Sequence, residues 1–301
     1  MGNSLVDLSK LTKPATVLIE KISDATGVLY EPTRIRRKAK AEADASKTKA
    51  LMDLEIEEIQ KRALNRLVTE EIKKQENIEN ITEKSFSSLN DDAKPENIED
   101  DWLSNFFDKC KLISDNEMQN LWSQILSAEA NKPGTFSKRT VEFMSTLDKS
   151  DAELFNKFCK FCWYFIDYQS IIINYENDIF KNNGINYSQL QHLTDLGLIN
   201  FETFGGFEKQ VKKVNINNLN IGYYGRILNL NFQNIESVKV GNVSLTKIGV
   251  DLLKISHPSV NKTFIQCEEY DDEYYHYIVN EFYKQKIILS EPLENRIYNK
   301  F

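Results

Sequence analysis

Apolar residues recur at helical spacing near the start of the chain. Between Leu8 and Leu29 they are separated by three or four positions, which places them along one face of a helix. Thr12 is a candidate N-cap with Pro14 in the first turn, and Gly27 is a candidate helix end. The opposite face carries mixed charges, which favours packing against another helix over insertion into a lipid surface.

Residues 33–81 form a segment without Gly or Pro that is rich in Ala, Glu, Lys, Leu and Arg, and a second apolar stripe lies within it at Met52, Ile56, Ile59, Ala63 and Leu67. This composition predicts a long helix. The stripe is too short for a regular coiled coil, so we expect a helical hairpin or self-association through this arm. The residues expected to mediate self-association are the apolar members of the two stripes: Leu11, Leu18, Ile22, Leu29, Ile56, Ile59 and Leu67.

A run of basic residues lies at the start of this long segment. Phosphate or lipid head groups could contact it, but charge runs are usually solvated helix faces, and Glu42 and Asp44 follow directly. The basic residues are Arg34, Arg36, Arg37, Lys38 and Lys40.

Short helices with their own start signals follow between Asp91 and Leu154. Acidic residues precede the first of them, and Ser114 with Glu117 and Ser150 with Glu153 match the capping-box pattern, so the carboxylates have a structural explanation. This pattern predicts a compact bundle of short helices. Its structural hub is expected to consist of inward-facing aromatic residues: Trp102, Phe106, Phe107 and Trp122.

The last helix expected in this module has the sequence AELFNKFCKFCWYFI and contains Cys159 and Cys162. No second cysteine pair stands at zinc-like spacing, and no βαβ pattern surrounds the motif. We therefore expect two buried thiols in an apolar helix.

Beyond Gly184 the composition shifts towards Asn, Tyr and β-branched residues. The stretch LQHLTDLGLINFE predicts a helix followed by a strand, RILNLNF and SVKVGNVSL predict further strands, and LTKIGVDLLKI predicts a helix. This order is typical of winged-helix domains. The exposed face of the candidate recognition helix carries no Arg or Lys, so phosphate contacts would come from the candidate wing, at Lys209, Lys212 and Lys213.

The tyrosine-rich segment YDDEYYHYIVNEFY predicts an amphipathic, acidic contact surface. Together these patterns predict a mainly α protein with a C-terminal α+β, winged-helix-like domain. It would comprise a long N-terminal helical arm (residues 1–84), a central short-helix bundle (85–183) and the C-terminal domain (184–301).

Several sequence segments of the central module resemble those of a known family. The words DDAKPENIEDDWL, FFDKC, SDNEMQNLW, ILSAEANKPGTFSKRT and LDKSDAELF look like the bacterial family known as domain of unknown function 2806, over about residues 15–165. The layout is more loosely similar to the alpha component of abortive-infection systems. The resemblance implies a bacterial or prophage protein linked to phage defence, and it brings no catalytic residues to transfer.

Composition narrows the function classes. The formal charge of −7 disfavours a generally basic nucleic-acid binder, and the four cysteines stand in contexts typical of reduced thiols in the cytoplasm. No secretory pattern and no apolar run of about 18 residues occurs, so we expect a cytoplasmic protein, with a peripheral place at the inner membrane as the alternative. We expect no catalytic residues, no cofactor and no metal.

The leading hypothesis is a non-enzymatic protein that forms homo-oligomers through its N-terminal helices and binds a protein partner through its C-terminal domain. One alternative is a winged-helix protein that binds nucleic acid. Another is an effector that acts on a membrane surface through the first amphipathic helix.

Overall fold

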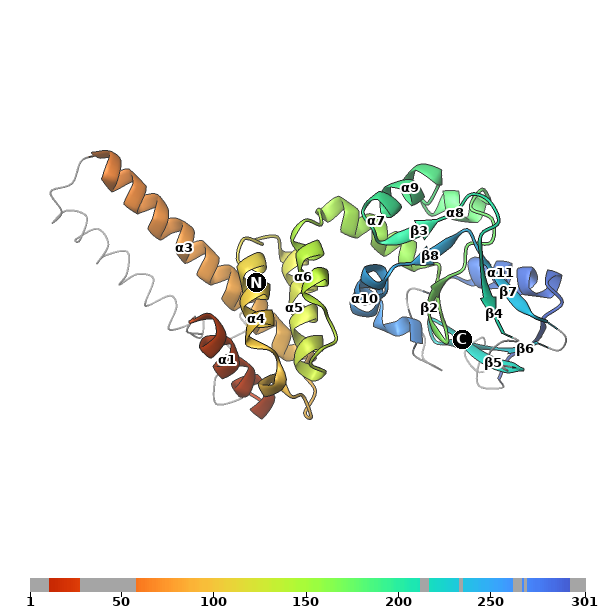
Figure 1. The fold of residues 1–301 in the computed structure, drawn as a ribbon, viewed down its shortest axis with the longest axis horizontal. Coiled ribbons are helices and arrows are strands. Elements are labelled where there is room, and N and C mark those ends of the chain that lie inside the picture. Colours follow the sequence, from red (N-terminus) through yellow and green to blue (C-terminus); the bar gives the residue numbers. More distant parts are fainter. Residues whose placement is uncertain are drawn as a thin grey trace. The chain divides into compact units, whose positions relative to one another are not determined.

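The structure is a computed structural model that describes residues 11–27, 58–211, 217–232, 235–261, 267 and 270–292. The chain divides into two compact units, residues 1–146 and 147–301, and each is described by itself. The described helices lie mostly in the N-terminal half, and antiparallel sheets occupy the C-terminal half, so the fold is mixed α/β (Figure 1).

The first amphipathic helix forms as expected. Helix α1 (Lys13–Thr26) begins after Thr12, whose hydroxyl accepts a hydrogen bond from the Ala15 amide, and it ends at Gly27 in the left-handed region. The apolar stripe faces inward, where α1 packs against α4 (Asp100–Cys110). The buried residues of this stripe are Ala15, Leu18 and Ile22.

Helix α3 (Glu58–Ser85) is buried only at its C-terminal end. None of its residues before Asn77 is buried, whereas the last turns pack against α5 (Asn116–Asn131). Figure 1 shows the N-terminal half of α3 extending past the other helices of the first unit. The earlier part of the predicted long helix lies outside the described residues.

The short helices of the first unit are α4, α5 and α6 (Lys138–Ser145), with 3₁₀ turns η2 (Phe86–Ser88) and η3 (Pro95–Asn97) between α3 and α4. Ser137 is the N-cap of α6 and accepts a hydrogen bond from the Thr140 amide. The predicted capping box at Ser114 is wrong, because Asp115 is the N-cap of α5 and accepts bonds from the amides of Glu117 and Met118. An aspartate carboxylate at this position also interacts favourably with the positive helix end.

Aromatic side chains from α4 and α5 form the core of the first unit. Trp102 stacks on Phe106 at 5.1 Å between ring centroids, and Phe106 meets Trp122 edge to face at 5.1 Å. Phe107 lies in the same cluster. All four expected hub residues are buried.

A buried carboxylate fixes the loop between α5 and α6. Glu129 accepts hydrogen bonds from the backbone amides of Gly134 (2.6 Å) and Phe136 (2.8 Å), and the Phe136 carbonyl accepts a bond from Trp102 Nε1 (2.9 Å). Burial raises the pKa of Glu129, while these amide hydrogen bonds oppose the rise. Glu129 therefore ties the Pro133–Gly134 turn to the aromatic core.

The second unit begins with α7 (Lys149–Cys159), which is shorter than expected. Asp148 is its N-cap, so the capping box predicted at Ser150 is wrong. The expected helix does not continue past Cys159, because residues Cys162–Phe165 form strand β1. From Trp163 to Phe165 burial alternates, with Trp163 and Phe165 inside and Tyr164 exposed, which is the period of a strand. Helical spacing and strand alternation are hard to separate in so apolar a run.

Strand β1 belongs to an antiparallel sheet of five strands in the order β2-β1-β5-β6-β9. The other members are β2 (Asp167–Ser170), β5 (Asn218–Tyr223), β6 (Arg226–Asn231) and β9 (Ile288–Ser290). Ile166, with a φ of 65°, forms the tight connection between β1 and β2. The long β5–β6 hairpin joins the sheet centre to its edge strand β9.

Two shorter antiparallel pairs complete the β structure. Strand β3 (Ile199–Phe201) pairs with β8 (Val243–Leu245), and β4 (Phe207–Gln210) pairs with β7 (Ser237–Gly241). Gly241 has a φ of 105°, and a Cβ there would collide with the Ile172 carbonyl, so this position requires glycine. The strands predicted from RILNLNF and SVKVGNVSL are confirmed.

Helices α8 (Asp178–Asn182) and α9 (Tyr187–Asp195) precede β3, and α10 (Lys247–Ser256) follows β8. Thr246 caps α10 by accepting from the Gly249 amide, and its own hydroxyl donates to the Gly197 carbonyl (2.7 Å). A Cβ on Gly249 would collide with the Leu198 carbonyl. The motif Leu245-Thr246-x-x-Gly249 therefore packs the start of α10 against the turn after α9.

The tyrosine-rich segment forms α11 (Asp272–Lys284), and the expectation that its aromatic residues make a contact surface is largely wrong. Tyr274, Tyr275 and Phe282 are buried. The Tyr274 hydroxyl receives a hydrogen bond from Trp163 Nε1 (3.0 Å) and lies 2.8 Å from the Ile171 carbonyl. Only Tyr283 of this helix is a strongly exposed tyrosine. The five-stranded sheet covers the face of α11 that the sequence pattern predicted to be exposed.

The boundaries of the two units differ from the three expected segments. The helical arm and the short helices α4 to α6 lie in one unit, which ends at Thr146. Helix α7 lies in the second unit, because it contacts α9 and α10. The 3₁₀ turn η5 (Pro258–Asn261) also belongs to the second unit, where it packs on β1 and β5.

We expect Glu129→Gln to lower the free energy of unfolding of the first unit by about 1–3 kcal/mol, because the amide nitrogen would face a backbone N–H and leave it unsatisfied. The measurement is a denaturant titration followed by tryptophan fluorescence in a Trp163→Phe background, where Trp102 and Trp122 report on the first unit. Glu142→Gln, at an exposed ion pair with Lys109, is the control and should change stability by less than about 0.5 kcal/mol.

The same denaturant titration, repeated at a series of pH values, tests the raised pKa of Glu129. Because the folded-state pKa of Glu129 lies above its ordinary value of 4.5, the folded state binds this proton more tightly than the unfolded state. Its contribution to stability therefore falls as pH rises from 4.5 through the folded-state pKa. Glu129→Gln should lack that component, and an unchanged pH profile would contradict this role.

Candidate interaction surface

Three aromatic side chains meet at the surface of the second unit. Tyr175 stands in the loop before α8, Tyr187 is the first residue of α9, and Phe201 is the last residue of β3. The ring centroids of Tyr175 and Phe201 are 5.1 Å apart, those of Tyr187 and Phe201 5.6 Å, and those of Tyr175 and Tyr187 6.3 Å. These three residues are called the aromatic cluster.

Asparagine caps fix the two segments that carry the tyrosines. Asn177 accepts from the Ile179 amide at the start of α8, and Asn186 accepts from the Ser188 amide at the start of α9. Asn174 makes a similar turn by accepting from the Glu176 amide. Such local bonds are typical of Asn at turns and helix starts. The tyrosines are therefore held by backbone geometry rather than by burial of their own rings.

Strand β3 positions the third ring. Ile199 and Phe201 lie on the same face of the strand, since side chains alternate, yet Ile199 is buried and Phe201 is half-buried. The strand thus runs from the core to the surface. Burial of Leu190 and Leu193 anchors α9 beside it.

Phe204 lies on the turn that follows β3 and is the most exposed large apolar side chain of the described residues, at 90%. Gly205 and Gly206 follow it with φ values of 79° and 69°, and a Cβ on Gly206 would meet the Gly241 carbonyl oxygen at 2.7 Å. The turn therefore needs both glycines, and Phe204 is presented on a constrained loop. Tyr187 of the cluster is 53% exposed.

The charges flanking the cluster in sequence are mainly acidic. Glu176 follows Tyr175 and Glu202 follows Phe201, while Lys181 pairs with Asp178 at 3.6 Å. Exposed aromatic rings in such surroundings are typical of protein interfaces, and the carboxylates oppose the approach of nucleic-acid phosphates.

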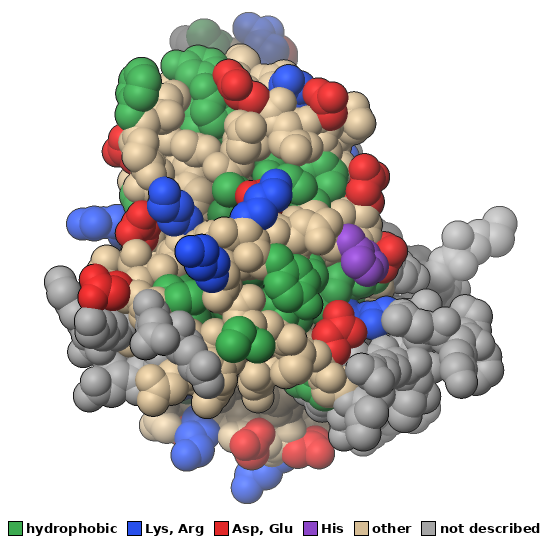
Figure 2. All heavy atoms as spheres, turned by 90° about the vertical axis from the view of Figure 1, so that its right-hand side faces the viewer, with side chains coloured by type: hydrophobic (Ala, Val, Ile, Leu, Met, Phe, Trp, Pro, Cys, Tyr) green, Lys and Arg blue, Asp and Glu red, His purple; other side chains and the backbone are tan. Residues whose placement is uncertain are grey.

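The basic residues expected to contact phosphate do not gather into a described patch. Lys209 forms an ion pair with Asp167 at 3.1 Å. The remaining ones lie outside the described residues: Arg34, Arg36, Arg37, Lys38, Lys40, Lys212 and Lys213. Figure 2 shows the side of the molecule where β6 and α11 are labelled in Figure 1, and there both signs of charge are interspersed without a continuous basic field.

Helix α9, the candidate recognition helix, uses part of its polar face in local bonds. His192 Nε2 lies 2.8 Å from an Asp151 carboxylate oxygen, and Gln191 donates to Asp195 at 3.1 Å. No Arg or Lys occurs in its sequence. The helix thus joins α7 through a hydrogen bond and offers little attraction to phosphate.

The expected self-association residues separate into two groups. Leu18 and Ile22 are buried inside the first unit, and Leu11 is half-buried, so they do not offer an open apolar face. Ile59 and Leu67 on α3 are 64% and 54% exposed. Leu29 and Ile56 lie outside the described residues.

A cavity of about 330 Å³ opens in the first unit between α1, α3 and α4. Its polar lining consists mainly of charge pairs, Glu71 with Lys74 and Asp108 with Lys111, each at 2.6 Å. Paired charges of opposite sign leave little preference for a ligand of either sign. Among the described residues, no group of three or more His, Cys, Asp or Glu side chains could hold a metal ion.

No described helix combines the length and the apolar character needed to cross a membrane.

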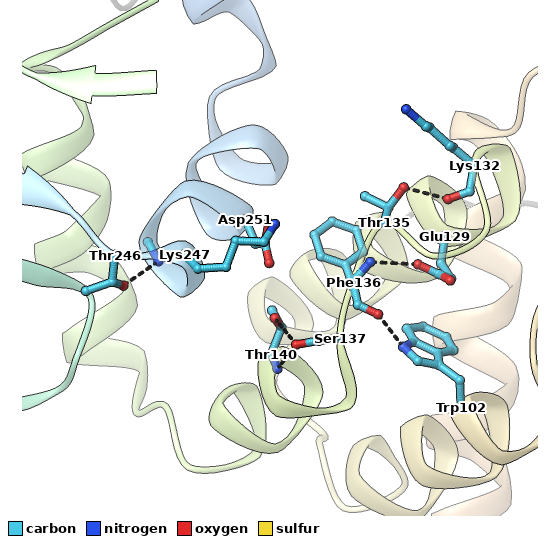
Figure 3. A network of polar contacts seen from close by, with 11 residues as sticks. Trp102, Glu129, Lys132, Thr135, Phe136, Ser137, Thr140, Thr246, Lys247 and Asp251 are labelled. Atoms are coloured by element: carbon cyan, nitrogen blue, oxygen red, sulfur yellow. Dashed lines mark hydrogen bonds and ion pairs between the residues drawn. The ribbon is translucent and has the colours of Figure 1, made fainter. Parts of the chain in front are cut away.

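Sequence patterns missed the aromatic cluster because its members come from three segments and follow no common period. Its one sequence signal is aromatic residues inside otherwise polar, Asn-rich loops. The patterns also missed Glu129, which stands in a helix among apolar residues. Its role in fixing the loop between α5 and α6 is visible only in the structure, where amides of that loop donate to its carboxylate (Figure 3).

The fold and this surface define a mixed α/β protein with an exposed aromatic cluster in its second unit. The chain belongs to the family described as protein of unknown function (DUF2806), whose family model matches residues 61–267, more than half of the sequence. The match begins later and extends further than the expected 15–165, and so covers α9, the aromatic cluster and α10. No curated protein and no solved structure matches the chain, so the expected distant similarity to the abortive-infection alpha component has no match behind it.

We expect Tyr187→Ala to change the free energy of unfolding of the second unit by less than about 0.5 kcal/mol, because the ring is half in solvent. Leu190→Ala, three residues along the same helix and fully buried, should cost about 2–5 kcal/mol. Thermal or denaturant unfolding of both variants checks this. A large loss in Tyr187→Ala would mean that the ring serves stability rather than recognition.

Proposed function

We propose that this protein is a non-enzymatic binding protein that recognises a protein partner through the aromatic cluster and Phe204. The observation that carries the proposal is the 90% exposure of Phe204 on a glycine-constrained turn, three residues after Phe201 of the aromatic cluster. Leaving such rings in water has no stabilising role in the chain itself, whereas large aromatics are enriched at binding hot spots.

The surroundings favour a particular kind of partner. Edge-to-face rings leave apolar faces and edges open, which suits aliphatic or proline side chains. The flanking carboxylates of Glu176 and Glu202 suit a segment that also carries Lys or Arg. We therefore propose an apolar and basic protein segment as the partner's contact region.

Self-association through α3 is the second part of the proposal. Ile59, Ala63 and Leu67 are spaced by four residues on one side of the helix, and all three are exposed. A helix that buries none of its first turns gains stability by pairing, since isolated helices are marginal in water. We propose that a second copy of this chain covers that stripe.

For the second unit we also propose the finer description of a winged-helix-like fold. Helices α8 and α9 precede β3 and β4, which pair with β8 and β7 after the β5–β6 hairpin, and α10 follows. Helices followed by antiparallel strand pairs are the order of a winged helix, and here β1 and β2 are inserted between α7 and α8. Nucleic-acid binding is the second candidate function on this ground. The lack of Arg and Lys on α9 favours a protein partner instead.

A role in phage defence stays a prediction from the sequence resemblance. A deletion strain challenged with a panel of phages, and complemented with the wild-type gene, tests it independently of the binding surface. Equal plating efficiency for both strains would speak against it.

We expect a photo-crosslinking phenylalanine analogue at position 204 to capture one protein in living cells, and the same analogue at position 283 to capture none. Tyr283 is the matched control, because it is 56% exposed and comes from α11 of the same unit. With the captured partner purified, Tyr187→Ser and Phe204→Ser should each weaken binding about tenfold or more, as expected of hot-spot aromatics. Tyr283→Ser should leave the dissociation constant unchanged.

Equal capture at both positions, or full affinity in the Phe204→Ser variant, would contradict the protein-binding proposal. Crosslinks to nucleic acid at position 204, with an affinity that falls steeply with salt, would support the winged-helix candidate in its place.

For self-association, light scattering of the full chain should give a multiple of the chain mass, and Ile59→Asp with Leu67→Asp should reduce it to the monomer mass. A charge placed in a pairing stripe leaves an uncompensated buried charge in the interface. Leu112→Asp, at a 66% exposed position elsewhere in the first unit, is the control and should keep the wild-type mass. A wild-type monomer at all concentrations would end this part of the proposal.

A further inference from the structure

Two thiols meet where α7 ends and β1 begins. Cys159 is the last residue of the helix and Cys162 the first of the strand, with only the turn at Lys160 and Phe161 between them, and the interaction of the two thiols lowers the pKa of Cys159 and raises that of Cys162. Both are fully buried free cysteines. Their approach results from the chain reversal at Lys160 and Phe161, which the expected continuous helix would not have produced.

Tyrosine hydroxyls fix this reversal from outside. Tyr224 donates to the Cys159 carbonyl at 2.8 Å, and Tyr223 donates to the Lys160 carbonyl at 3.0 Å. The Phe161 amide bonds to the Phe158 carbonyl. The backbone between the two cysteines is thus held by bonds from β5 and the turn that follows it, which keeps the thiols close.

A buried histidine lies next to Cys159, one of the two cysteines. His257, at the end of α10 and 4% exposed, has its ring centroid 5.9 Å from that of Tyr224, the residue whose hydroxyl bonds the Cys159 carbonyl. His257 Nδ1 is also 3.1 Å from Ser256 Oγ. Burial raises the pKa of Cys159, but hydrogen bonds from Cys162 and His257 outweigh it and bring the pKa to about 6. Burial raises the pKa of Cys162 well above its ordinary value.

Cys110 of the first unit is a natural comparison. It is equally buried, and burial raises its pKa well above the ordinary value of a thiol. The causes of that rise include no second thiol and no histidine. The two environments therefore differ in thiolate character and not in exposure.

The arrangement suits a small oxidant better than a metal or a large substrate. The described residues contain no set of three metal-ligating side chains placed for an ion. A thiolate beside a resolving thiol is the usual arrangement for reversible oxidation, and a fully buried pair admits only small reagents, through local opening.

We propose that Cys159 and Cys162 form a hydroperoxide-sensitive dithiol that closes to an intramolecular disulfide. The Cys159 thiolate attacks one oxygen of the hydroperoxide, the O–O bond breaks, and the leaving oxygen takes a proton to give water or an alcohol. The Cys162 sulfur then attacks the sulfenic sulfur of Cys159. The S–S bond forms, the S–O bond breaks, and the released hydroxide combines with the thiol proton as water.

The test uses the full chain with Cys110→Ser and Cys267→Ser, so that only this pair remains. Treatment with hydrogen peroxide should lower the intact mass by that of two hydrogen atoms, and a reducing agent should restore it. Cys162→Ser should instead accumulate a sulfenic acid that a carbon-acid probe traps. His257→Gln should slow disulfide formation about tenfold, because the thiolate fraction falls. Circular dichroism checks that each protein is folded.

The matched control keeps Cys110 as the sole cysteine and should stay unmodified over the same time. Oxidation of Cys110 at the rate of the pair would overturn the proposal, as would a folded pair that keeps its full mass at peroxide concentrations that oxidise the denatured chain. A disulfide that forms only as fast as the whole unit unfolds, measured by hydrogen exchange on the same sample, would also overturn it. None of these outcomes depends on the partner-binding surface.

Discussion

The hydroxyl group of Tyr274 is the buried polar contact on which the second unit depends. It accepts a hydrogen bond from Trp163 Nε1 and lies within 3.0 Å of the Phe161 carbonyl and 2.8 Å of the Ile171 carbonyl. A buried indole N–H without a partner costs about 1–3 kcal/mol, so the hydroxyl stabilises β1 by accepting from Trp163, and its single proton is shared between the two carbonyls that flank the β1–β2 hairpin. It connects α11, from the end of the chain, to the first strands of the unit.

Around that contact, rings of Trp163, Tyr223 and Tyr275 stack on one another, with centroid distances of 4.7 Å for the first two and 5.6 Å for Trp163 and Tyr275. Such packing gives a rigid core. Rigidity matters for the surface, because exposed rings bind with less loss of entropy when their backbone is already fixed. The aromatic cluster and Phe204 are held in this way by Asn caps, a short strand pair and two glycines. The same unit holds Cys159, Cys162 and His257, so the proposed binding surface and the proposed dithiol belong to one scaffold.

The two units use buried polar groups differently. In the first, the Glu129 carboxylate organises a local loop, with donors five and seven residues further along. In the second, hydroxyl groups of Tyr223, Tyr224 and Tyr274 reach backbone carbonyls far away in the sequence. Local contacts leave a trace in sequence patterns and distant ones do not. This explains why the helices of the first unit were largely anticipated and the β1–β2 hairpin was not.

The sequence by itself determined the first helix with its Thr12 cap and Gly27 end, the aromatic core of the short helices, and the elements α9, β3, β6, β7, β8 and α10. These features depend on spacing within one segment and on capping residues next to it. Only the tertiary structure decided that the chain turns into a strand at Cys162, that α11 is buried, and that Tyr175, Tyr187 and Phe201 meet. The physical reason is that strand pairing, burial and ring contacts join residues distant in sequence, and the local pattern is compatible with more than one such arrangement.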